Sequence, residues 1–365
     1  MSFTPDEIAR YQRHLSLSGF GPEAQTKLQA ARVLVIGAGG LGCPILLYLA
    51  AAGVGKLTVI DADVVDVSNL QRQVLFTTDD VGQPKAEAAA RRLRALNSLI
   101  EIVPVVGRLN RDNALELIRA HDVVVDGSDN FATRYLVNDA CVLAGKPLVY
   151  GAIQGFEGQA SVFNFKGGPT YRCLFPEPPA AGTVPNCSEA GVLGVLPGLI
   201  GTIQATEAIK VLTGIGEPLS GRLLLWNSLT MTSRTLRFAA DPESRAITEL
   251  PPEGYGETCA VPAKLASNEI EAAELRGALA GVQLIDVRED WERALGAIQP
   301  SVHVPLGQLG SGAAGDALAS LDPQRETVVF CAGGVRSLKA LAPLRERHGF
   351  QSLRSLKGGF KGWPA

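Results

Sequence analysis

The sequence predicts an α/β protein with a doubly wound parallel sheet, an antiparallel extension of that sheet, and a second, smaller α/β unit. Three observations support this fold class. Apolar strand patterns alternate with helical patterns from residue 33 to about residue 151, and this alternation builds parallel sheets. Segments 155–165 and 221–226 then alternate polar and apolar residues, as antiparallel strands do. A further alternation of strands and helices begins after residue 263, where the composition changes.

The composition is that of a globular protein and argues against several classes. The chain has 365 residues, of which 46% are hydrophobic, enough for two or three domains with cores of their own. A net charge of −3 argues against a nucleic-acid-binding protein, which usually presents a basic surface. The uncharged run 33–55 could span a bilayer, but its six glycines and one proline fit a strand, a turn and a helix better. No signal-peptide pattern is visible, so we expect no membrane insertion and a cytoplasmic location.

The first nucleotide signal is a glycine cluster between two apolar runs. The apolar run 33–36 is followed by Gly37, Gly39, Gly40 and Gly42, a small-residue helix, a second apolar run at 57–60, and Asp61. This order matches the Rossmann-type fingerprint, in which glycines let the backbone approach phosphates and a later acidic residue binds ribose hydroxyls. The fingerprint indicates a nucleotide site, but it fits dehydrogenases, methyltransferases and adenylating enzymes equally well.

Charged residues downstream add to this signal. Lys85 lies in the first turn of a predicted helix over 81–97, where it opposes the helix dipole unless an anion is close by. The predicted strand 121–126 ends in the sequence DGSDN, and such carboxyl ends are where open α/β sheets bind ligands. The basic sequence RYQRH at 10–14 is predicted, from periodicity alone, to be a solvated face of an N-terminal helix.

Together these residues resemble the MoeB/ThiF family, ubiquitin-activating-enzyme-like adenylyltransferases that activate sulfur-carrier proteins. The resemblance covers residues 10 to about 237. It rests on an ordered set of segments: GAGGLG with Asp61, SNLQRQ at 68–73, Lys85, SDN at 128–130, and NCSEAGVLGVLPGLIGTIQATEAIK at 186–210. It implies ATP and Mg²⁺ as cofactors, and as partner a small ubiquitin-like sulfur carrier that ends in Gly-Gly.

The resemblance also implies roles for single residues. Arg72 and Lys85 would hold the triphosphate, and Asp129 would hold Mg²⁺. Arg13 would reach the phosphates of a second subunit, which implies a homodimer and revises the interpretation of a solvated face. Cys187 matches a nucleophile whose role differs between family members. The implied nucleotide-binding set is Gly37, Gly39, Gly40, Gly42, Asp61, Ser68, Asn69, Leu70, Gln71, Arg72, Lys85, Asp129, Asn130 and Arg13.

The C-terminal part resembles a rhodanese domain, as in molybdopterin-synthase adenylyltransferase/sulfurtransferases. The matching segments are LIDVRED at 284–290, VHVPL at 302–306, TVVFCAGGVRS at 327–337 and SLKGGFKGW at 355–363. Cys331 follows a strand and precedes a glycine turn, so backbone N–H groups are expected to point at its sulfur and stabilise a thiolate or persulfide. Arg336 would add positive charge. We therefore expect an adenylyltransferase domain at 1–245, a linker at 246–263 and a rhodanese domain at 264–365.

The sequence departs from the family at the structural zinc, which most members hold with two C-x-x-C pairs. Thr170, Ser244 and Ile247 occupy three of the four ligand positions, and Cys173 alone does not make a tetrahedral site. We therefore predict no structural zinc. The six cysteines form no C-x-x-C pair either: they are Cys43, Cys141, Cys173, Cys187, Cys259 and Cys331.

The predicted function is adenylation of the carrier's C-terminal glycine, followed by persulfide transfer from Cys331 to give a thiocarboxylate. The predicted catalytic residues are Cys187, Cys331, Arg72, Asp129 and Arg336, and the sulfur donor would be a cysteine desulfurase or thiosulfate. In one alternative the rhodanese unit is only a docking module. In another the chain is a nucleotide-binding redox scaffold, although a nicotinamide site needs no triphosphate clamp. The carrier and its pathway stay open among molybdopterin, thiamine, tRNA thiolation, cysteine and secondary metabolites.

Overall fold

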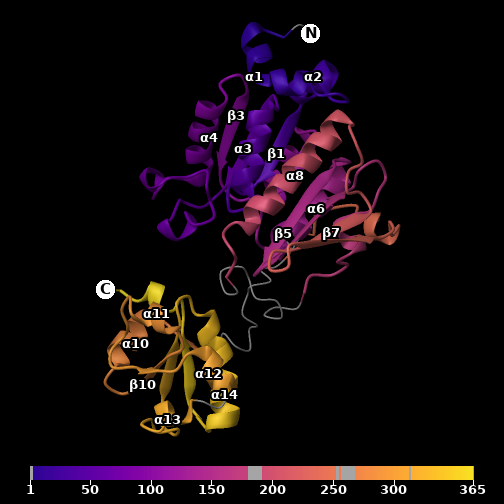
Figure 1. Cartoon of the computed structure of the whole chain (residues 1–365). Coiled ribbons are helices and arrows are strands. Elements are labelled where there is room, and N and C mark those ends of the chain that lie inside the picture. The colour runs from indigo at the N-terminus through magenta and orange to yellow at the C-terminus, as the bar shows by residue number, and fades with distance from the viewer. Residues whose placement is uncertain (1–2, 180–190, 252–254, 256–267, 312–313, 365) are drawn as a thin grey trace. The chain divides into compact units, whose positions relative to one another are not determined.

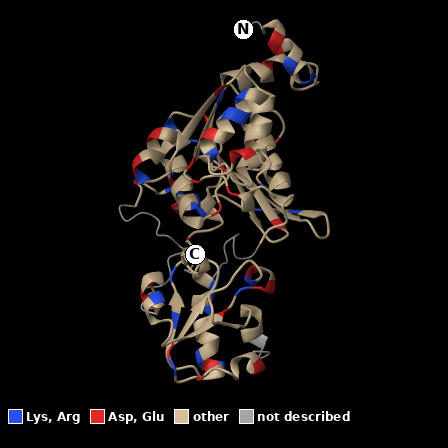
Figure 2. Ribbon diagram, turned by 90° about the vertical axis from the view of Figure 1, so that its left-hand side faces the viewer, with Lys and Arg blue, Asp and Glu red and all other residues tan. Residues whose placement is uncertain are grey.

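The computed structural model describes residues 3–179, 191–251, 255, 268–311 and 314–364 (Figure 1). Contacts divide the chain into two compact units, Met1–Thr258 and Cys259–Ala365. Most of the expected linker over 246–263 lies outside the described residues, as do Cys187 and Cys259. In the view of Figure 2, acidic and basic residues are mixed on both units.

The first unit is built on an eight-stranded sheet in the order β3-β2-β1-β4-β5-β6-β7-β8. The strands β3 to β5 of this order are parallel, and β6, β7 and β8 extend the sheet in antiparallel fashion. This confirms the predicted doubly wound sheet with its extension. The strands are β1 (Arg32–Ile36), β2 (Lys56–Asp61), β3 (Glu101–Val106), β4 (Val123–Asp126), β5 (Leu148–Gln154), β6 (Glu157–Phe163), β7 (Arg222–Asn227) and β8 (Thr232–Arg237).

Helices cover both faces of this sheet. The described helices are α1 (Pro5–Leu15), α2 (Gly21–Ala30), α3 (Gly42–Ala52), α4 (Lys85–Leu96), α5 (Arg111–Arg119), α6 (Phe131–Ala144) and α8 (Leu196–Thr213). Residues of α3, α4 and α8 share one buried apolar cluster, and residues of α5 and α6 belong to another on the opposite face. The helices α3 and α8 pack side by side (Figure 1). The two clusters explain why the parallel strands read as continuous apolar runs.

The apolar run over 33–55 divides into β1, the glycine loop and α3, as the sequence predicts. Of the described helices, none is both long and apolar enough to cross a membrane. The N-terminal helix α1 begins with a capping box, in which the Thr4 hydroxyl accepts the Glu7 N–H and the Glu7 carboxylate accepts the Thr4 N–H. Its Tyr11 is buried and its hydroxyl accepts a 2.9 Å hydrogen bond from Asn97 Nδ2.

Hydrogen bonds join the two segments to which the family resemblance assigns zinc ligands. The Cys173 sulfur accepts N–H groups of Thr170 and Asp241, each at 3.3 Å. Ser244 Oγ donates to Asp241 Oδ2 at 2.7 Å. Within the described residues no group of three or more His, Cys, Asp or Glu side chains could hold a metal ion. Polar contacts thus join the chain around the 3-10 helix Tyr171–Cys173 to the chain that follows β8.

The chain beyond β8 returns to α6 through Tyr255. The Tyr255 hydroxyl donates to Asp139 Oδ2 at 2.7 Å. Arg172 donates to both oxygens of the same carboxylate, at 2.8 Å each. Tyr135, on α6, donates to the carbonyl oxygens of Phe175 and Glu177 at 3.0 and 2.7 Å. Tyr255 is therefore tied to the first unit by a charge-assisted hydrogen bond.

The second unit is a five-stranded parallel sheet in the order β11-β10-β12-β13-β9. It confirms the small α/β unit that the sequence predicts. Its strands are β9 (Glu269–Ile270), β10 (Gln283–Asp286), β11 (Val302–His303), β12 (Thr327–Phe330) and β13 (Leu353–Leu356). Its described helices are α10 (Ala272–Ala278), α11 (Asp290–Arg293), α12 (Leu306–Ser311), α13 (Gly315–Leu318) and α14 (Val335–His348).

Candidate functional site

The glycine loop connects β1 to the N-terminus of α3, and two of its glycines are sterically required. Gly37 has a φ of +88°, and a Cβ there would lie 3.0 Å from the Gly127 carbonyl oxygen. A Cβ on Gly42 would collide with the Gly37 carbonyl oxygen. The loop therefore brings the backbone of β1 and α3 into close contact, and the N–H groups at the start of α3 can bind an anion.

Asp61 orders this loop from the end of β2. Its Oδ2 accepts the Ala38 N–H at 2.7 Å, and its Oδ1 accepts the Asp63 N–H at 2.8 Å. Burial raises the pKa of Asp61, against the opposing effect of these hydrogen bonds. A carboxylate has about four acceptor positions, so the oxygens that hold the loop can also accept ribose hydroxyls.

Lys85 is buried at the first position of α4 and is paired with Asp63. Its Nζ lies 3.0 Å from Asp63 Oδ2, and its side chain is 7% exposed whereas that of Asp63 is 64% exposed. An anion is expected beside Lys85 because this residue lies in the first turn of α4. In this structure that anion is the Asp63 carboxylate. The sequence analysis missed Asp63. Asp63 could have been identified from its position two residues after Asp61, at the end of the same strand.

The SNLQRQ segment over 68–73 packs against the glycine loop and the start of α8. Arg72 is half-buried, and its Nη1 donates to the Ser68 carbonyl at 3.1 Å. A Cβ on Gly40 would lie 3.1 Å from Pro197 Cβ and 3.6 Å from Arg72 Cγ. Gln71 lies against Gly194, close before α8. The structure thus brings together three segments that are far apart in the sequence.

The remaining residues of that segment are placed at its surface or its edge. Ser68 is exposed, and its N–H and hydroxyl both donate to Asp66 Oδ1. Asn69 and Leu70 are half-buried. In the glycine loop, a Cβ added to Gly39 would lie 3.9 Å from its nearest neighbouring atom, so the packing does not require a glycine there. The contacts described for Ser68, Asn69, Leu70 and Gly39 therefore do not assign a nucleotide-binding role to these residues.

The sequence DGSDN at the end of β4 contains an exposed carboxylate and a buried one. Asp129 is exposed. Asp126 is buried, burial raises its pKa, and its backbone carbonyl accepts a 2.7 Å hydrogen bond from Gln204 on α8. Asn130 caps α6, because its Oδ1 accepts the Thr133 N–H at 2.9 Å. Asp126 and Gln204 lie beneath the site and were not predicted, since only the fold brings α8 to β4.

Arg13 is not brought to the other predicted residues of its own chain. It is exposed in the last turn of α1. The neighbouring Tyr11 packs against Gly53, at the C-terminal end of α3. The glycine loop is at the N-terminal end of this 11-residue helix, about 16 Å away by helical rise. Arg13 therefore lies away from the glycine loop of its own chain.

In the second unit, Cys331 lies directly after β12, in the loop that leads into α14. The residue is 1% exposed. Its sulfur accepts the Gly334 N–H at 3.1 Å and the Ser337 hydroxyl at 3.5 Å. The 3-10 helix Phe360–Gly362 supports the loop, since the Phe360 N–H donates to the Cys331 carbonyl at 2.7 Å. This geometry places the sulfur atom of Cys331 on two hydrogen-bond donors within the loop.

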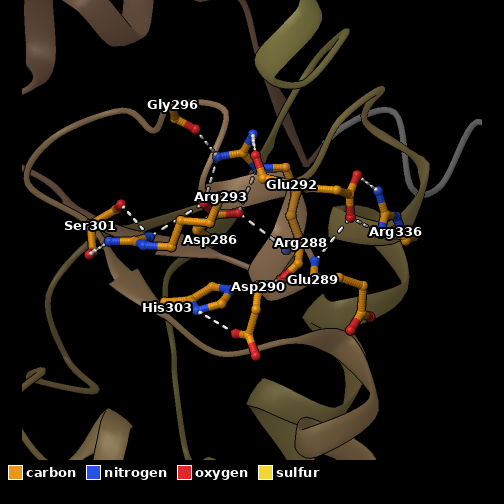
Figure 3. A network of polar contacts seen from close by, with 10 residues as sticks. All are labelled: Asp286, Arg288, Glu289, Asp290, Glu292, Arg293, Gly296, Ser301, His303 and Arg336. Carbon is orange, nitrogen blue, oxygen red and sulfur yellow. Dashed lines mark hydrogen bonds and ion pairs between the residues drawn. The ribbon is translucent and has the colours of Figure 1, made fainter. Parts of the chain in front are cut away.

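Arg336 is paired with a carboxylate that the sequence analysis did not identify. Its Nη1 and Nη2 donate to the two oxygens of Glu292 at 2.7 and 2.6 Å (Figure 3). The hydrogen bonds that Arg336 donates to Glu292 are the main cause of the raised pKa of Arg336, with smaller contributions from the charges of Cys331 and Glu289. The role of Arg336 beside Cys331 stays a prediction, and the structure adds that its guanidinium is paired with Glu292.

Glu292 belongs to a larger network of polar contacts at the end of β10. The buried Arg288 donates to both oxygens of the buried Asp286, at 2.9 and 2.8 Å. Arg288 also donates to the backbone carbonyl of Glu292 at 3.2 Å. Figure 3 shows three guanidinium groups among four carboxylates. The guanidiniums are those of Arg288, Arg293 and Arg336, and the carboxylates are those of Asp286, Glu289, Asp290 and Glu292.

Comparisons with known proteins agree with both halves of this description. Residues 11–246 match the ThiF family, and residues 271–365 match the rhodanese-like domain. The chain is 47% identical to the probable adenylyltransferase/sulfurtransferase MoeZ of Mycobacterium tuberculosis, over 98% of this chain and 93% of that protein. It is 55% identical to the sulfur carrier protein adenylyltransferase of Thermus thermophilus, over 66% of this chain and 91% of that protein.

A solved structure shows the same fold in the first unit. The crystal structure of Escherichia coli MccB with MccA-N7isoAsn aligns with a TM-score of 0.58 and 26% sequence identity. The alignment covers 64% of this chain and 73% of that chain.

Proposed function

The chain belongs to the ThiF family and ends in a rhodanese-like domain, and from this we propose that it makes the thiocarboxylate of a small sulfur-carrier protein. The first unit adenylates the C-terminal glycine of a ubiquitin-like carrier with ATP. The second unit carries sulfane sulfur on Cys331 and delivers it to the activated glycine. The observation that carries the proposal is the presence, in one chain, of a glycine loop flanked by Lys85 and Arg72 and of a cysteine sulfur that accepts the Gly334 N–H and the Ser337 hydroxyl.

Adenylation needs a site that accepts a triphosphate and stabilises the departing pyrophosphate. The carrier's carboxylate attacks the α-phosphorus, the bond to the β-phosphate oxygen breaks, and pyrophosphate leaves with its negative charge. Gly37 and Gly42 let the loop approach the phosphates, while Lys85 and Arg72 supply positive charge. Phosphate oxygens would replace Asp63 as the partner of Lys85, so the buried ammonium group stays paired.

Magnesium fits the residues at the end of β4. Asp129 has an exposed carboxylate and lies two residues after Gly127, which is close to Gly37 of the glycine loop. Mg²⁺ is usually bound by one or two carboxylates together with substrate phosphates. We propose Asp129 as its protein ligand. When bound, the ion would offset the charge of the phosphates, while Asp61 keeps the glycine loop in place through Ala38.

Sulfur transfer follows as a thiol-exchange sequence. The Cys331 persulfide attacks the carbonyl carbon of the acyl-adenylate, and AMP leaves, which gives an acyl disulfide on Cys331. A thiolate then attacks the Cys331 sulfur, the S–S bond breaks, and the thiocarboxylate is released. If Cys187 supplies this thiolate, a Cys187–Cys331 disulfide results, and an external thiol must reduce it. Cys187 could alternatively hold the acyl group as a thioester before sulfur arrives.

A homodimer completes the proposal, with Arg13 of each chain serving the other chain's phosphates. The exposure of Arg13 and its distance from its own glycine loop support this assignment. Arg13→Ala should then lower adenylation without altering Cys331 chemistry. Mixing Arg13→Ala with Lys85→Met subunits should restore about a quarter to a half of the activity, because mixed dimers contain one intact site.

The deciding experiment measures the two half-reactions separately in the full chain. With ATP and a carrier that ends in Gly-Gly, we expect exchange of labelled pyrophosphate into ATP. With a sulfur donor added, we expect a carrier mass increase of one sulfur in place of one oxygen. Cys331→Ala should abolish the mass change and leave the exchange intact. Undiminished thiocarboxylate formation in Cys331→Ala would reduce the rhodanese unit to a docking module, and nicotinamide binding without exchange would favour a redox scaffold.

Absence of a structural zinc is part of the proposal as well. Its support is the hydrogen-bonded junction between Cys173, Thr170 and Asp241. Metal analysis of the purified chain should find less than about 0.1 zinc per chain, since one thiol cannot hold a tetrahedral ion. One tightly held zinc per chain would contradict this.

A further inference from the structure

The carboxylate that pairs with Arg336 controls the charge beside the reactive sulfur. Residues 332–335 carry no charge, so Arg336 is the first cation after Cys331. Glu292 binds this guanidinium through both oxygens and is only 8% exposed. A bidentate pair of this kind is geometrically fixed and close to neutral overall.

Glu292 is itself held in a defined position. Its Oε2 accepts the Glu289 N–H at 2.9 Å, and its backbone carbonyl accepts Arg288 Nη1 at 3.2 Å. Burial raises the pKa of Glu292, but Arg336, the Glu289 N–H and Arg288 outweigh burial and lower it overall. Glu292 is therefore ionised at neutral pH, and Arg336 has its countercharge before any substrate arrives.

The surrounding charges do not restore a positive field. Arg288 and Arg293 both contact Asp286, and the exposed Glu289 lies on the Arg336 side of the network (Figure 3). Lys361 donates its backbone N–H to the Ala332 carbonyl, but its side chain is exposed, so solvent and salt screen its charge. The loop therefore offers the Gly334 N–H and the Ser337 hydroxyl to the sulfur, and Arg336, the cation of the loop, is already paired with Glu292.

We propose that Glu292 is a positioning residue that selects the sulfur donor: Cys331 is loaded from persulfides, and the thiosulfate dianion is disfavoured. The proposal rests on the sulfur-carrying role of Cys331 given above. From a persulfide, the Cys331 thiolate attacks the terminal sulfur, the donor S–S bond breaks, and the donor thiolate leaves. From thiosulfate, the same attack would release sulfite, but it brings a thiolate against two negative charges that Arg336 is not free to offset.

Alkylation provides a direct test of this charge. Full-length protein is treated with iodoacetate, an anion, or with neutral iodoacetamide, and the rate at Cys331 is read by mass spectrometry. Glu292→Gln should raise the iodoacetate-to-iodoacetamide rate ratio about tenfold, because one short-range countercharge is removed in a partly buried site. A purely structural role for Glu292 would change both rates alike and leave the ratio unchanged, which would overturn the proposal.

Donor selection gives the functional readout. Glu292→Gln should raise kcat/KM for thiosulfate about tenfold, mostly through a lower KM, as expected for a freed guanidinium that binds an anion. Persulfide loading from a cysteine desulfurase with L-cysteine should change less than about threefold, because a persulfide carries at most one negative charge whereas thiosulfate carries two. An equal change for both donors would overturn the proposal. If wild-type Cys331 accepts sulfur from neither donor, the proposed function fails, while the alkylation ratio still judges Glu292.

Two further variants keep the test decisive. Glu274→Gln removes a carboxylate from another arginine pair of the same unit, with Arg354, and should leave the alkylation ratio unchanged. Glu289→Gln removes an exposed carboxylate near Arg336, and we expect this variant to fold. It replaces Glu292→Gln in the test if circular dichroism shows that Glu292→Gln is unfolded. It should raise the ratio about twofold, since solvent screens the charge. A ratio unchanged in Glu289→Gln when Glu292→Gln does not fold would overturn the proposal.

Discussion

The two units hold the cations of their sites in different ways. In the first unit Lys85 pairs with an exposed carboxylate, Asp63, and Arg72 donates to a backbone carbonyl. In the second unit Arg336 is bound by both oxygens of the buried Glu292. A triphosphate brings several negative charges and needs cations that can change partners, whereas a sulfane sulfur brings at most one. Both sites contain cations. The sites differ in whether a cation can exchange its partner in the protein for a ligand.

The largest expected effect separates the units completely. Cys331→Ser should lower thiocarboxylate formation by more than about 10³-fold, because a hydroxyl cannot carry sulfane sulfur. ATP–pyrophosphate exchange should stay within about twofold of wild type, since exchange needs only the first unit. Both are measured on the full chain with a Gly-Gly carrier. Cys173→Ser is the matched control and should keep both activities; persistent thiocarboxylate in Cys331→Ser would remove the sulfur-carrying role.

Next in size is loss of a cation from the first site. Lys85→Met should slow pyrophosphate exchange about 10²-fold, the usual cost of removing one transition-state charge. Sulfur loading of Cys331 should be unaffected. Lys56→Met, which removes a half-buried lysine paired with Glu101, is the control and should exchange normally. If Lys85→Met exchanged at the wild-type rate, Lys85 would be a structural partner of Asp63 and not part of a phosphate site.

A third prediction concerns arginines of the first unit that lie away from its site. Burial alone would raise the pKa of Asp80, but the Thr77 N–H, Arg92 and Arg91 outweigh it and hold the pKa at about 2. A lowered folded-state pKa stabilises the fold above the unfolded value near 4, and this stabilisation is lost as the pH falls toward 2. Asp80→Asn should thus cost about 2 kcal/mol at pH 7 and almost nothing near pH 2.

Urea unfolding of Asp80→Asn at several pH values checks this. Glu87→Gln, an exposed carboxylate on α4, should show no comparable loss. A cost for Asp80→Asn that is the same at pH 7 and pH 3 would mean that packing, and not the charge, stabilises this position.

The smallest effect tests whether Lys85 changes partners. Asp63→Asn leaves the buried ammonium group without its carboxylate and should cost about 1 kcal/mol, since Asp63 is largely exposed and the pair is screened. Mg-ATP should return part of this loss, so its stabilising shift in thermal unfolding should be larger for Asp63→Asn than for the wild type. Equal shifts for both proteins would show that ATP does not replace Asp63 beside Lys85.

The sequence predicted those parts of the molecule that depend on local patterns. The glycine loop, β1, α3 and β2 follow one another within thirty residues, so their chemistry and periodicity are readable together. The parallel arrangement of these strands follows from their alternation with helices, whereas their order in the sheet came from the structure. The loop after β12 was also found locally, because Cys331, its glycines and Arg336 lie within six residues.

Contacts made only by tertiary folding were not predictable. Glu292 reaches Arg336 across 44 residues of sequence, and Gln204 reaches Asp126 across 78. Nothing in either segment specifies its partner. Asn130 shows a different difficulty: one side chain fits both a nucleotide motif and a helix cap, and the structure uses it as a cap. The strand β9 has two residues, too few for a periodic signal.

The hydrogen bond between Tyr255 and Asp139 fixes one end of the chain segment that leads to the second unit. The chain is fixed to the first unit at Tyr255 and enters β9 at Glu269, with residues 256–268 between them. An extended chain gains at most about 3.5 Å per residue, so this segment reaches about 50 Å. Tyr255 therefore limits how far Glu269, the first residue of β9, can lie from the first unit.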